Sequence, residues 1–272
     1  MATWDRARTK RVKRVARVLA VLAPAAYFAP LLTGAMVACG AVDVGRHRRR
    51  SYELFEKYFA GNGLLTWLLS PLNLLADAFS YRNKGRYALA DLPPACRAEV
   101  ETCVRAYREN GDRIKAHIAA EAGASNRSML TFRWYDAVQD TALRIPAFES
   151  DFQHVKTIAV SAFNRRERTS RHFGPLRLTF RVLYNLEPIN SDAVSIEVDG
   201  VTHYWRDDPL FIFDDTFFHQ SVNDADMVRH CLFMDIIRPN HAPAAFAVAV
   251  RATSAVASSF KRLFYSHWSF IR

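Results

Sequence analysis

Two histidines stand in short stretches whose composition is typical of a metal site. His172 begins the sequence His172-Phe-Gly-Pro, and His219 ends the sequence Phe213-Asp-Asp-Thr-Phe-Phe-His219. Arg229 follows at the head of an apolar run that favours a buried strand. Imidazoles bind iron and similar metals, and a buried guanidinium needs an anion beside it. The three residues together predict a site for iron and a dicarboxylate.

Each of these residues also has a simpler interpretation. A single histidine near a strand end is often an ordinary core or surface residue, and Arg229 could form an ion pair with Asp224 or Asp226 on the preceding turn. Arg181 lies in the run 178–186, where alternation assigns successive residues to opposite faces. If the other face packs on the core wall, Arg181 points into a cavity. Otherwise it is a surface arginine.

Length and cysteine content limit the class of protein. The 272 residues allow one catalytic domain with a full core and some additional segments. The four cysteines show no CxxC spacing, so neither a zinc knuckle nor a disulfide framework is indicated. We therefore expect a reducing compartment.

The net charge of +10 is unevenly distributed. Residues 1–50 contain 11 Lys and Arg against Asp5 and Asp43, whereas the remainder of the chain is nearly neutral. A nucleic-acid-binding domain would carry its excess of basic residues on the folded body. We therefore expect no nucleic-acid partner.

The basic residues flank an apolar stretch, 18–42, which predicts a membrane anchor over residues 1–50. About 25 residues of helix suffice to cross a bilayer. Pro24 and Pro30 interrupt the stretch, so a bent or re-entrant insertion and one straight span remain alternatives. A secretory signal ending near Cys39 is a third alternative, which the four arginines that follow disfavour.

Residues 51–128 are expected to form a helical segment. Within it, 63–79 is apolar with a central Pro71, which indicates either helices at a membrane interface or short helices under the core. Residues 95–122 repeat apolar side chains at helical spacing and predict one or two amphipathic helices. The tail, 241–272, is basic and aromatic, and it predicts an amphipathic helix.

Strand-like patterns occupy the segment 129–240. They cover 155–163, 178–186, 194–198, 201–205, 210–213 and 229–237, and Asp199-Gly200 predicts a hairpin between two of them. Short strands with turn residues and no intervening helices favour an antiparallel sandwich or small barrel. The fold class is therefore mainly β with flanking helices.

The stretch 161–239 resembles the aspartyl/asparaginyl β-hydroxylase family. The resemblance rests on the two histidine stretches, on Arg181, on Tyr204-Trp-Arg-Asp207 after Gly200, on Arg229 and on Asp235-Ile-Ile-Arg-Pro239. That family consists of Fe(II)/2-oxoglutarate dioxygenases built on a double-stranded β-helix, or jelly roll. The resemblance therefore implies this fold, and Fe(II), 2-oxoglutarate and O2 as cofactor and cosubstrates.

The resemblance also implies roles for individual residues. His172 and His219 would bind iron, while Arg229 and Ser161 would bind the distal carboxylate of 2-oxoglutarate. Arg181 would contact substrate or cosubstrate. Asp215 would orient a ligand or a bound water.

Two positions depart from the family pattern. Gly174 stands where many relatives carry a carboxylate ligand, so two histidines would hold the metal, as in the animal aspartyl hydroxylases. Weaker iron binding is the expected result. Leu183 replaces a histidine that contacts the cosubstrate.

The order of segments is similar to that of the bacterial branch that hydroxylates acyl chains of lipid A or ornithine lipids. We therefore expect a membrane lipid as substrate and a catalytic domain on the cytoplasmic side of the inner membrane. An anchor raises the effective concentration of a lipid substrate. The alternatives are hydroxylation of Asp or Asn in a protein, and a membrane-associated binding module without catalysis.

Overall fold

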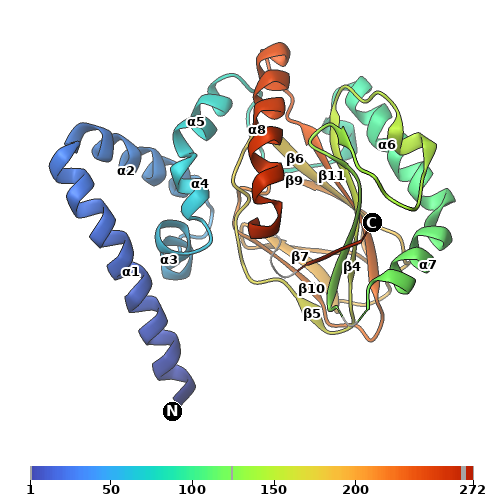
Figure 1. Ribbon diagram of the computed structural model, residues 1–272, viewed down its shortest axis with the longest axis horizontal. Coiled ribbons are helices and arrows are strands. Elements are labelled where there is room, and N and C mark those ends of the chain that lie inside the picture. The colour runs from blue at the N-terminus through green and yellow to red at the C-terminus, as the bar shows by residue number, and fades with distance from the viewer. Residues whose placement is uncertain (1, 124, 265–267, 272) are drawn as a thin grey trace.

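The computed structural model describes residues 2–123, 125–264 and 268–271, and its centre is a sandwich of two β-sheets (Figure 1). The large sheet has the strand order β1-β9-β6-β11-β4-β2-β12, with β3 beside β2, and the small sheet has the order β5-β10-β7-β8. The strands are β1 Arg86–Tyr87, β2 Arg127–Trp134, β3 Ala137–Val138, β4 Val155–Phe163, β5 Glu167–Arg168, β6 Thr179–Asn185, β7 Val194–Val198, β8 Val201–Tyr204, β9 Leu210–Phe213, β10 His219–Asn223, β11 Arg229–Ile237 and β12 Ser269–Ile271.

Successive strands from β4 to β11 alternate between the two sheets, except at the β7–β8 hairpin. This is the connectivity of a jelly roll. At the hairpin, Asp199 and Gly200 have φ values of 52° and 74°, as a two-residue turn of this kind requires. The prediction of a mainly β sandwich with flanking helices is confirmed.

The central strands of the large sheet contribute to two cores. In β11, Leu232, Met234 and Ile236 pack on the outer face, which α6 (Pro94–Glu109) and α7 (Gly111–Glu121) cover. Cys231 and Phe233 face inward and pack against the small sheet. The predicted amphipathic helices at 95–122 are thus confirmed, and the inner face remains for the site.

Five N-terminal helices form a layer on the other side of the sandwich (Figure 1). They are α1 Ala2–Phe28, α2 Pro30–Gly45, α3 Tyr52–Ala60, α4 Leu64–Leu68 and α5 Ser70–Ala78. The stretch 18–42 is divided at Ala29, whose φ of −141° and ψ of 63° are not helical. A residue before proline is disfavoured in the helical region, so Pro30 accounts for the break. The alternative of one straight helix over residues 18–42 is therefore wrong.

The length and hydrophobicity of a helix decide whether it could cross a bilayer. Within the described part of the chain, no helix combines the length and the hydrophobicity that a membrane crossing requires.

The remaining elements follow the core strands or connect them. Two short 3-10 turns cover Leu89–Asp91 and Pro146–Glu149, and helix α8 covers Pro243–Phe264. The sequence patterns did not indicate β12, which pairs in parallel with β2 at the edge of the large sheet.

A buried cluster of charges joins the helical layer to the sandwich. Arg177, which is fully buried, contacts Asp43 of α2, Asp77 of α5 and Asp214 after β9. Arg46 binds Asp43 and Asp214, each at 2.9 Å. Arg46 is the first of the four arginines after Cys39, which were expected to form a basic flank of the membrane anchor. This is wrong for Arg46, because its guanidinium forms ion pairs inside the protein.

Candidate active site

His172 and His219 are direct neighbours across the small sheet. Their backbones exchange two hydrogen bonds of 3.0 Å, and their ring centroids lie 4.1 Å apart. His219 begins β10 opposite Val198, on the face that packs into the inner core. It is buried, whereas His172 lies at the rim and is partly exposed. The structure thus brings both predicted metal ligands to one place.

Backbone carbonyls determine which ring nitrogen of each histidine is available. The Nδ1 atoms of His172 and His219 lie 2.7 Å and 2.8 Å from the carbonyl oxygens of Ser170 and Phe217. An N–H at Nδ1 that donates to a carbonyl leaves the lone pair of Nε2 free. Each imidazole can therefore offer Nε2 to a metal.

Both imidazoles are neutral at physiological pH. The pKa of His172 is lowered to about 4, mainly by desolvation, with smaller contributions from Arg181 and Arg127. Desolvation and the neighbouring His172 hold the pKa of His219 well below its ordinary value. Metal binding requires the neutral form, so no proton has to leave either ring first.

The residues next to the histidines point the opposite way, into the helical layer. Phe173 and Phe218 stack at 4.8 Å and belong to a core cluster with Trp67 of α4. His47, at the end of α2, accepts a hydrogen bond of 3.3 Å from the N–H of Phe218 through Nε2. The N-terminal helices therefore hold the two histidine-bearing segments from behind. No sequence pattern indicated this structural role of His47.

Arg229 approaches the inter-sheet space from β11 and is buried. Its Nε and Nη1 atoms have no hydrogen-bond partner among the residues that the structure describes. Asp224 and Asp226, the alternative partners, instead bind Arg168 and Arg166. The proposed ion pair of Arg229 with either of them is therefore wrong.

Aromatic rings enclose the Arg229 guanidinium, whose carbon lies 4.8 Å and 5.2 Å from the ring centroids of Phe163 and Trp205. Burial lowers the pKa of Arg229, because the charged form is poorly solvated there. The indole Nε1 of Trp205 is also buried without a partner among the described residues. Unpartnered buried donors cost free energy, so these donor groups fit a carboxylate ligand.

Trp205 is a candidate ligand contact that sequence reasoning missed. It follows β8 directly, and the motif Tyr204-Trp205 drew attention only as part of the family pattern. Its position beside Arg229 depends on the crossing of the two sheets. No local pattern encodes that crossing.

Ser161 lies on β4 opposite Cys231, two positions along the strand from the pair that Phe163 forms with Arg229. The hydroxyl donates to the Cys231 carbonyl at 3.2 Å and is buried. The structure therefore places Ser161 on the inner face and close in register to Arg229.

Arg181 also points between the sheets, where two carboxylates bind it. Its Nε donates to Asp235 at 2.7 Å and its Nη2 to Asp215 at 2.9 Å. Its guanidinium carbon lies 3.8 Å from the ring centroid of Phe233. The surface alternative for Arg181 is wrong. Its contacts instead hold Asp215 in a fixed position.

Asp215 lies beside the histidine segment, and its backbone carbonyl accepts a hydrogen bond of 2.7 Å from the N–H of Gly174. Burial raises the pKa of Asp215 to about 7, against the lowering effect of Arg181. Among the described residues, no group of three or more His, Cys, Asp or Glu side chains is placed so that it could hold a metal ion.

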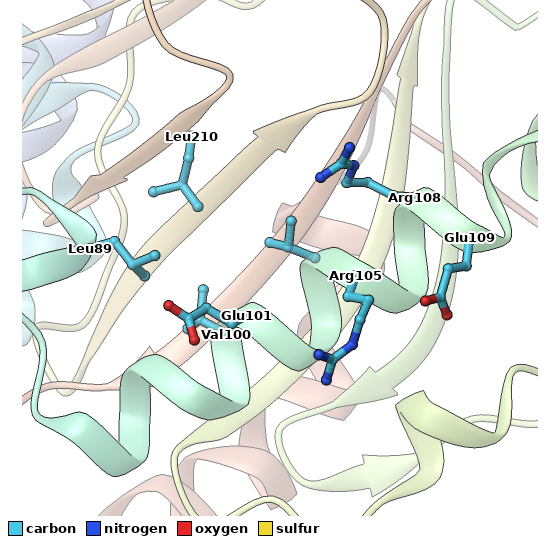
Figure 2. A pocket seen from close by; sticks show the side chains of 8 residues that line it. Leu89, Val100, Glu101, Arg105, Arg108, Glu109 and Leu210 are labelled. Atoms are coloured by element: carbon cyan, nitrogen blue, oxygen red, sulfur yellow. The ribbon is translucent and has the colours of Figure 1, made fainter.

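A cavity of about 620 Å³ lies elsewhere, on the helix-covered face of the large sheet (Figure 2). Leu89, Val100, Val104 and Leu210 supply its apolar side chains, and arginine and glutamate side chains of α6 surround them. None of the predicted site residues lines it.

Comparison with known proteins shows a similarity between part of the sequence and one family. Residues 137–239 match the family described as aspartyl/asparaginyl beta-hydroxylase. An ornithine lipid ester-linked acyl 2-hydroxylase from Rhizobium tropici is 32% identical over 91 residues, which are 33% of this chain and 32% of that protein. The chain thus spans about a third of the length of this curated relative.

Solved structures with some likeness include a 2OG-Fe(II) oxygenase family oxidoreductase from Burkholderia pseudomallei, with 12% identity, coverage of 60% of this chain and 97% of the other, and a TM-score of 0.33. A prolyl-4-hydroxylase from Pseudomonas putida has 14% identity, coverage of 64% and 99%, and a TM-score of 0.32.

The matched segment contains His172, His219, Arg181 and Arg229. The part of the chain from residue 137 to residue 239, which carries all four of these residues, is therefore similar to the aspartyl/asparaginyl beta-hydroxylase family.

Proposed function

We propose that this protein is an Fe(II)- and 2-oxoglutarate-dependent dioxygenase that hydroxylates the 2-position of a fatty acyl chain on a membrane lipid. The observation that carries the reaction type is the arrangement of three groups. Two adjacent imidazoles have Nε2 available, and His219 contacts Phe213 of the inner core. Arg229 contacts Trp205 of the same core, and its Nε and Nη1 atoms have no hydrogen-bond partner among the described residues.

His172 and His219 would hold ferrous iron, because the rings are adjacent and desolvated. Arg229 and Trp205 would bind the distal carboxylate of 2-oxoglutarate, which satisfies donors that otherwise have no partner. When bound, iron and 2-oxoglutarate supply the oxidising power that inserts one atom of O2 into a C–H bond.

The protein's own contribution is positioning and exclusion of water. Phe163, Phe233 and Trp205 surround the two arginines with apolar rings. Charge interactions are stronger in such surroundings than in water. Arg181 holds Asp215 beside the histidines, where that carboxyl group can orient a bound water.

The lipid substrate is supported by the name of the Rhizobium relative and by the apolar N-terminal helices. Ornithine lipids and lipid A both carry ester- or amide-linked acyl chains of the required kind. For a substrate in the bilayer, we propose the cytoplasmic side of the inner membrane as the location of the enzyme.

The test uses the purified full-length protein with Fe(II), 2-oxoglutarate and O2, and with ornithine lipid or lipid A in mixed micelles. We expect succinate and a lipid whose mass has increased by one oxygen atom. Hydroxylation of aspartyl or asparaginyl peptides without any change in the lipids would overturn the lipid assignment. The absence of succinate with every substrate would favour a binding module without catalysis.

A further inference from the structure

Helices α4 and α5 expose apolar side chains and bury polar ones, which is the reverse of an ordinary surface helix. Their outer face carries a stripe at helical spacing, and each of its side chains is between 39% and 55% exposed. We call these residues the leucine stripe: Leu64, Leu68, Leu72, Leu75 and Phe79. A surface helix usually buries such a face, so the leucine stripe requires a separate explanation.

The buried face of the same helices is mainly polar, and it holds the segment that follows His172. Thr66 donates from Oγ1 to the carbonyl of Gly174 at 3.0 Å. The Asn73 side chain donates to the Pro175 carbonyl at 3.1 Å and accepts from the N–H of Arg177 at 2.9 Å. The polar contacts set the orientation of the helices, and this orientation directs the leucine stripe outward.

Exposed apolar side chains are concentrated in this part of the protein. Among the described residues, most large hydrophobic side chains that are exposed precede Arg82, and Val138, Val228 and Val248 are those that follow it. Helix α2 contacts both α4 and α5, and its own exposed residues include Leu31, which is 90% exposed. The leucine stripe therefore belongs to a larger apolar surface.

The same part of the chain carries the positive charge. Residues 1–84 contain 14 of the 37 Lys and Arg and 5 of the 27 Asp and Glu, which is +9 of the net +10. Two of those five acids, Asp43 and Asp77, are neutralised internally by Arg177. Arg82 and Lys84 are exposed just beyond Phe79 and Tyr81. Aromatic residues followed by basic ones are typical of segments at a membrane interface.

We propose that the leucine stripe is the surface with which the protein lies on an anionic phospholipid bilayer. An apolar helix face with basic residues beside it matches the two layers that such a bilayer presents, acyl chains and anionic headgroups. Because α4 and α5 bind the segment 174–177 directly, this orientation keeps the histidine pair next to the membrane. The inference concerns the partner of the proposed lipid hydroxylase and rests on that function.

The first experiment measures which surface enters the bilayer. In the full-length protein with Cys39→Ser, an environment-sensitive fluorophore is attached to Leu72→Cys or, as control, to Asp112→Cys on α7. Vesicles contain phosphatidylglycerol and phosphatidylethanolamine with brominated acyl chains. We expect quenching at position 72 and none at position 112. Vesicle-bound protein with no quenching at position 72 would overturn the proposal.

The second experiment measures affinity by sedimentation with the same lipids, unbrominated. The triple variant Leu68→Ser, Leu72→Ser, Leu75→Ser should bind vesicles about tenfold more weakly. The matched control, Val138→Ser with Val228→Ser, removes exposed apolar side chains from the body of the protein and should bind as the parent does. Equal binding by both variants would overturn the proposal, provided that melting temperatures show that both are folded.

Other occupants of the leucine stripe give distinct results. A fluorescence change at position 72 that grows with protein concentration without vesicles would assign the stripe to a second copy of the chain and overturn the proposal. Neither experiment measures hydroxylation. Failure of membrane docking can therefore be distinguished from failure of the proposed reaction, which the lipid mass measurement tests.

Discussion

The carboxylate of Asp215 occupies the space beside Gly174 into which a side chain at position 174 would project. A Cβ built on Gly174 would lie 2.3 Å from the Cγ and Oδ1 atoms of Asp215. An ion pair with Arg181 and the backbone hydrogen bond between Gly174 and Asp215 hold this carboxylate in place. Glycine at this position is therefore coupled to aspartate at position 215. A carboxylate side chain at position 174, which would add a ligand to the two histidines, has no room here.

This relationship predicts a non-additive pair of substitutions. Gly174→Asp alone should lower the free energy of unfolding by about 1–3 kcal/mol, because the new side chain overlaps Asp215. Combining it with Asp215→Gly should restore stability and tighten Fe(II) binding by about tenfold, since a carboxylate ligand joins the two imidazoles. Thermal melting and iron titration measure the two effects. Additive losses in the double variant would contradict the coupling.

Arg229 should destabilise the folded protein when no cosubstrate is bound. Replacement by methionine removes two unsatisfied buried donors and a desolvated charge, so Arg229→Met should stabilise the cosubstrate-free protein by about 1–3 kcal/mol. The same variant should lose the rise in melting temperature that 2-oxoglutarate gives the parent. Differential scanning fluorimetry with and without 2-oxoglutarate tests both statements. A less stable variant that still responds to 2-oxoglutarate would show that Arg229 has another partner.

The histidine pair should be required for both metal binding and turnover. His219→Ala removes one of two imidazole ligands, and succinate formation should fall by more than about 100-fold with loss of Fe(II) binding. His117→Ala on α7 is the matched control and should retain both. Equal activity of the two variants would exclude His219 as a ligand.

The buried cluster around Arg177 should contribute far more to stability than the surface ion pairs do. Arg177→Met removes one of the two arginines that pair with the buried Asp43 and Asp214, leaves only Arg46 beside them, and should cost about 3–5 kcal/mol. Arg166→Ala breaks an ion pair in which both side chains are 72% exposed, and it should have a much smaller effect because solvent screens the pair. Urea unfolding of the two variants gives the comparison. Similar losses would mean that the cluster does not join the helical layer to the sandwich.

Stability should fall in acid because of Asp214. Burial would raise the pKa of this carboxyl group, but Arg46 and Arg177 outweigh burial and hold the pKa well below its ordinary value. Because the pKa of Asp214 is lower in the folded state than in the unfolded state, the ionised carboxylate contributes to the free energy of unfolding. Its contribution is complete above about pH 5 and is lost progressively as the pH falls below that. The free energy of unfolding, measured from pH 6 to pH 3, should fall less steeply for Asp214→Asn than for the parent.

The sequence determined most of the sandwich. The strands 155–163, 194–198, 210–213 and 229–237 were predicted with the bounds that the structure gives them. Apolar runs with turn residues at their ends are local signals, and so is Asp199-Gly200. By contrast, β2 is buried on both faces and shows no alternation, and β12 has three residues that gain their conformation only by pairing with β2.

The sequence also supplied His172, His219 and Arg229 as candidates, because the three together resemble a family pattern although each alone has an ordinary interpretation. Only the tertiary structure brought the two rings together and left Arg229 without a partner among the described residues. It also turned Arg46 inward to an ion pair and directed the leucine stripe outward. Charge and hydrophobicity belong to a residue, whereas burial and partnership depend on what the fold packs against it.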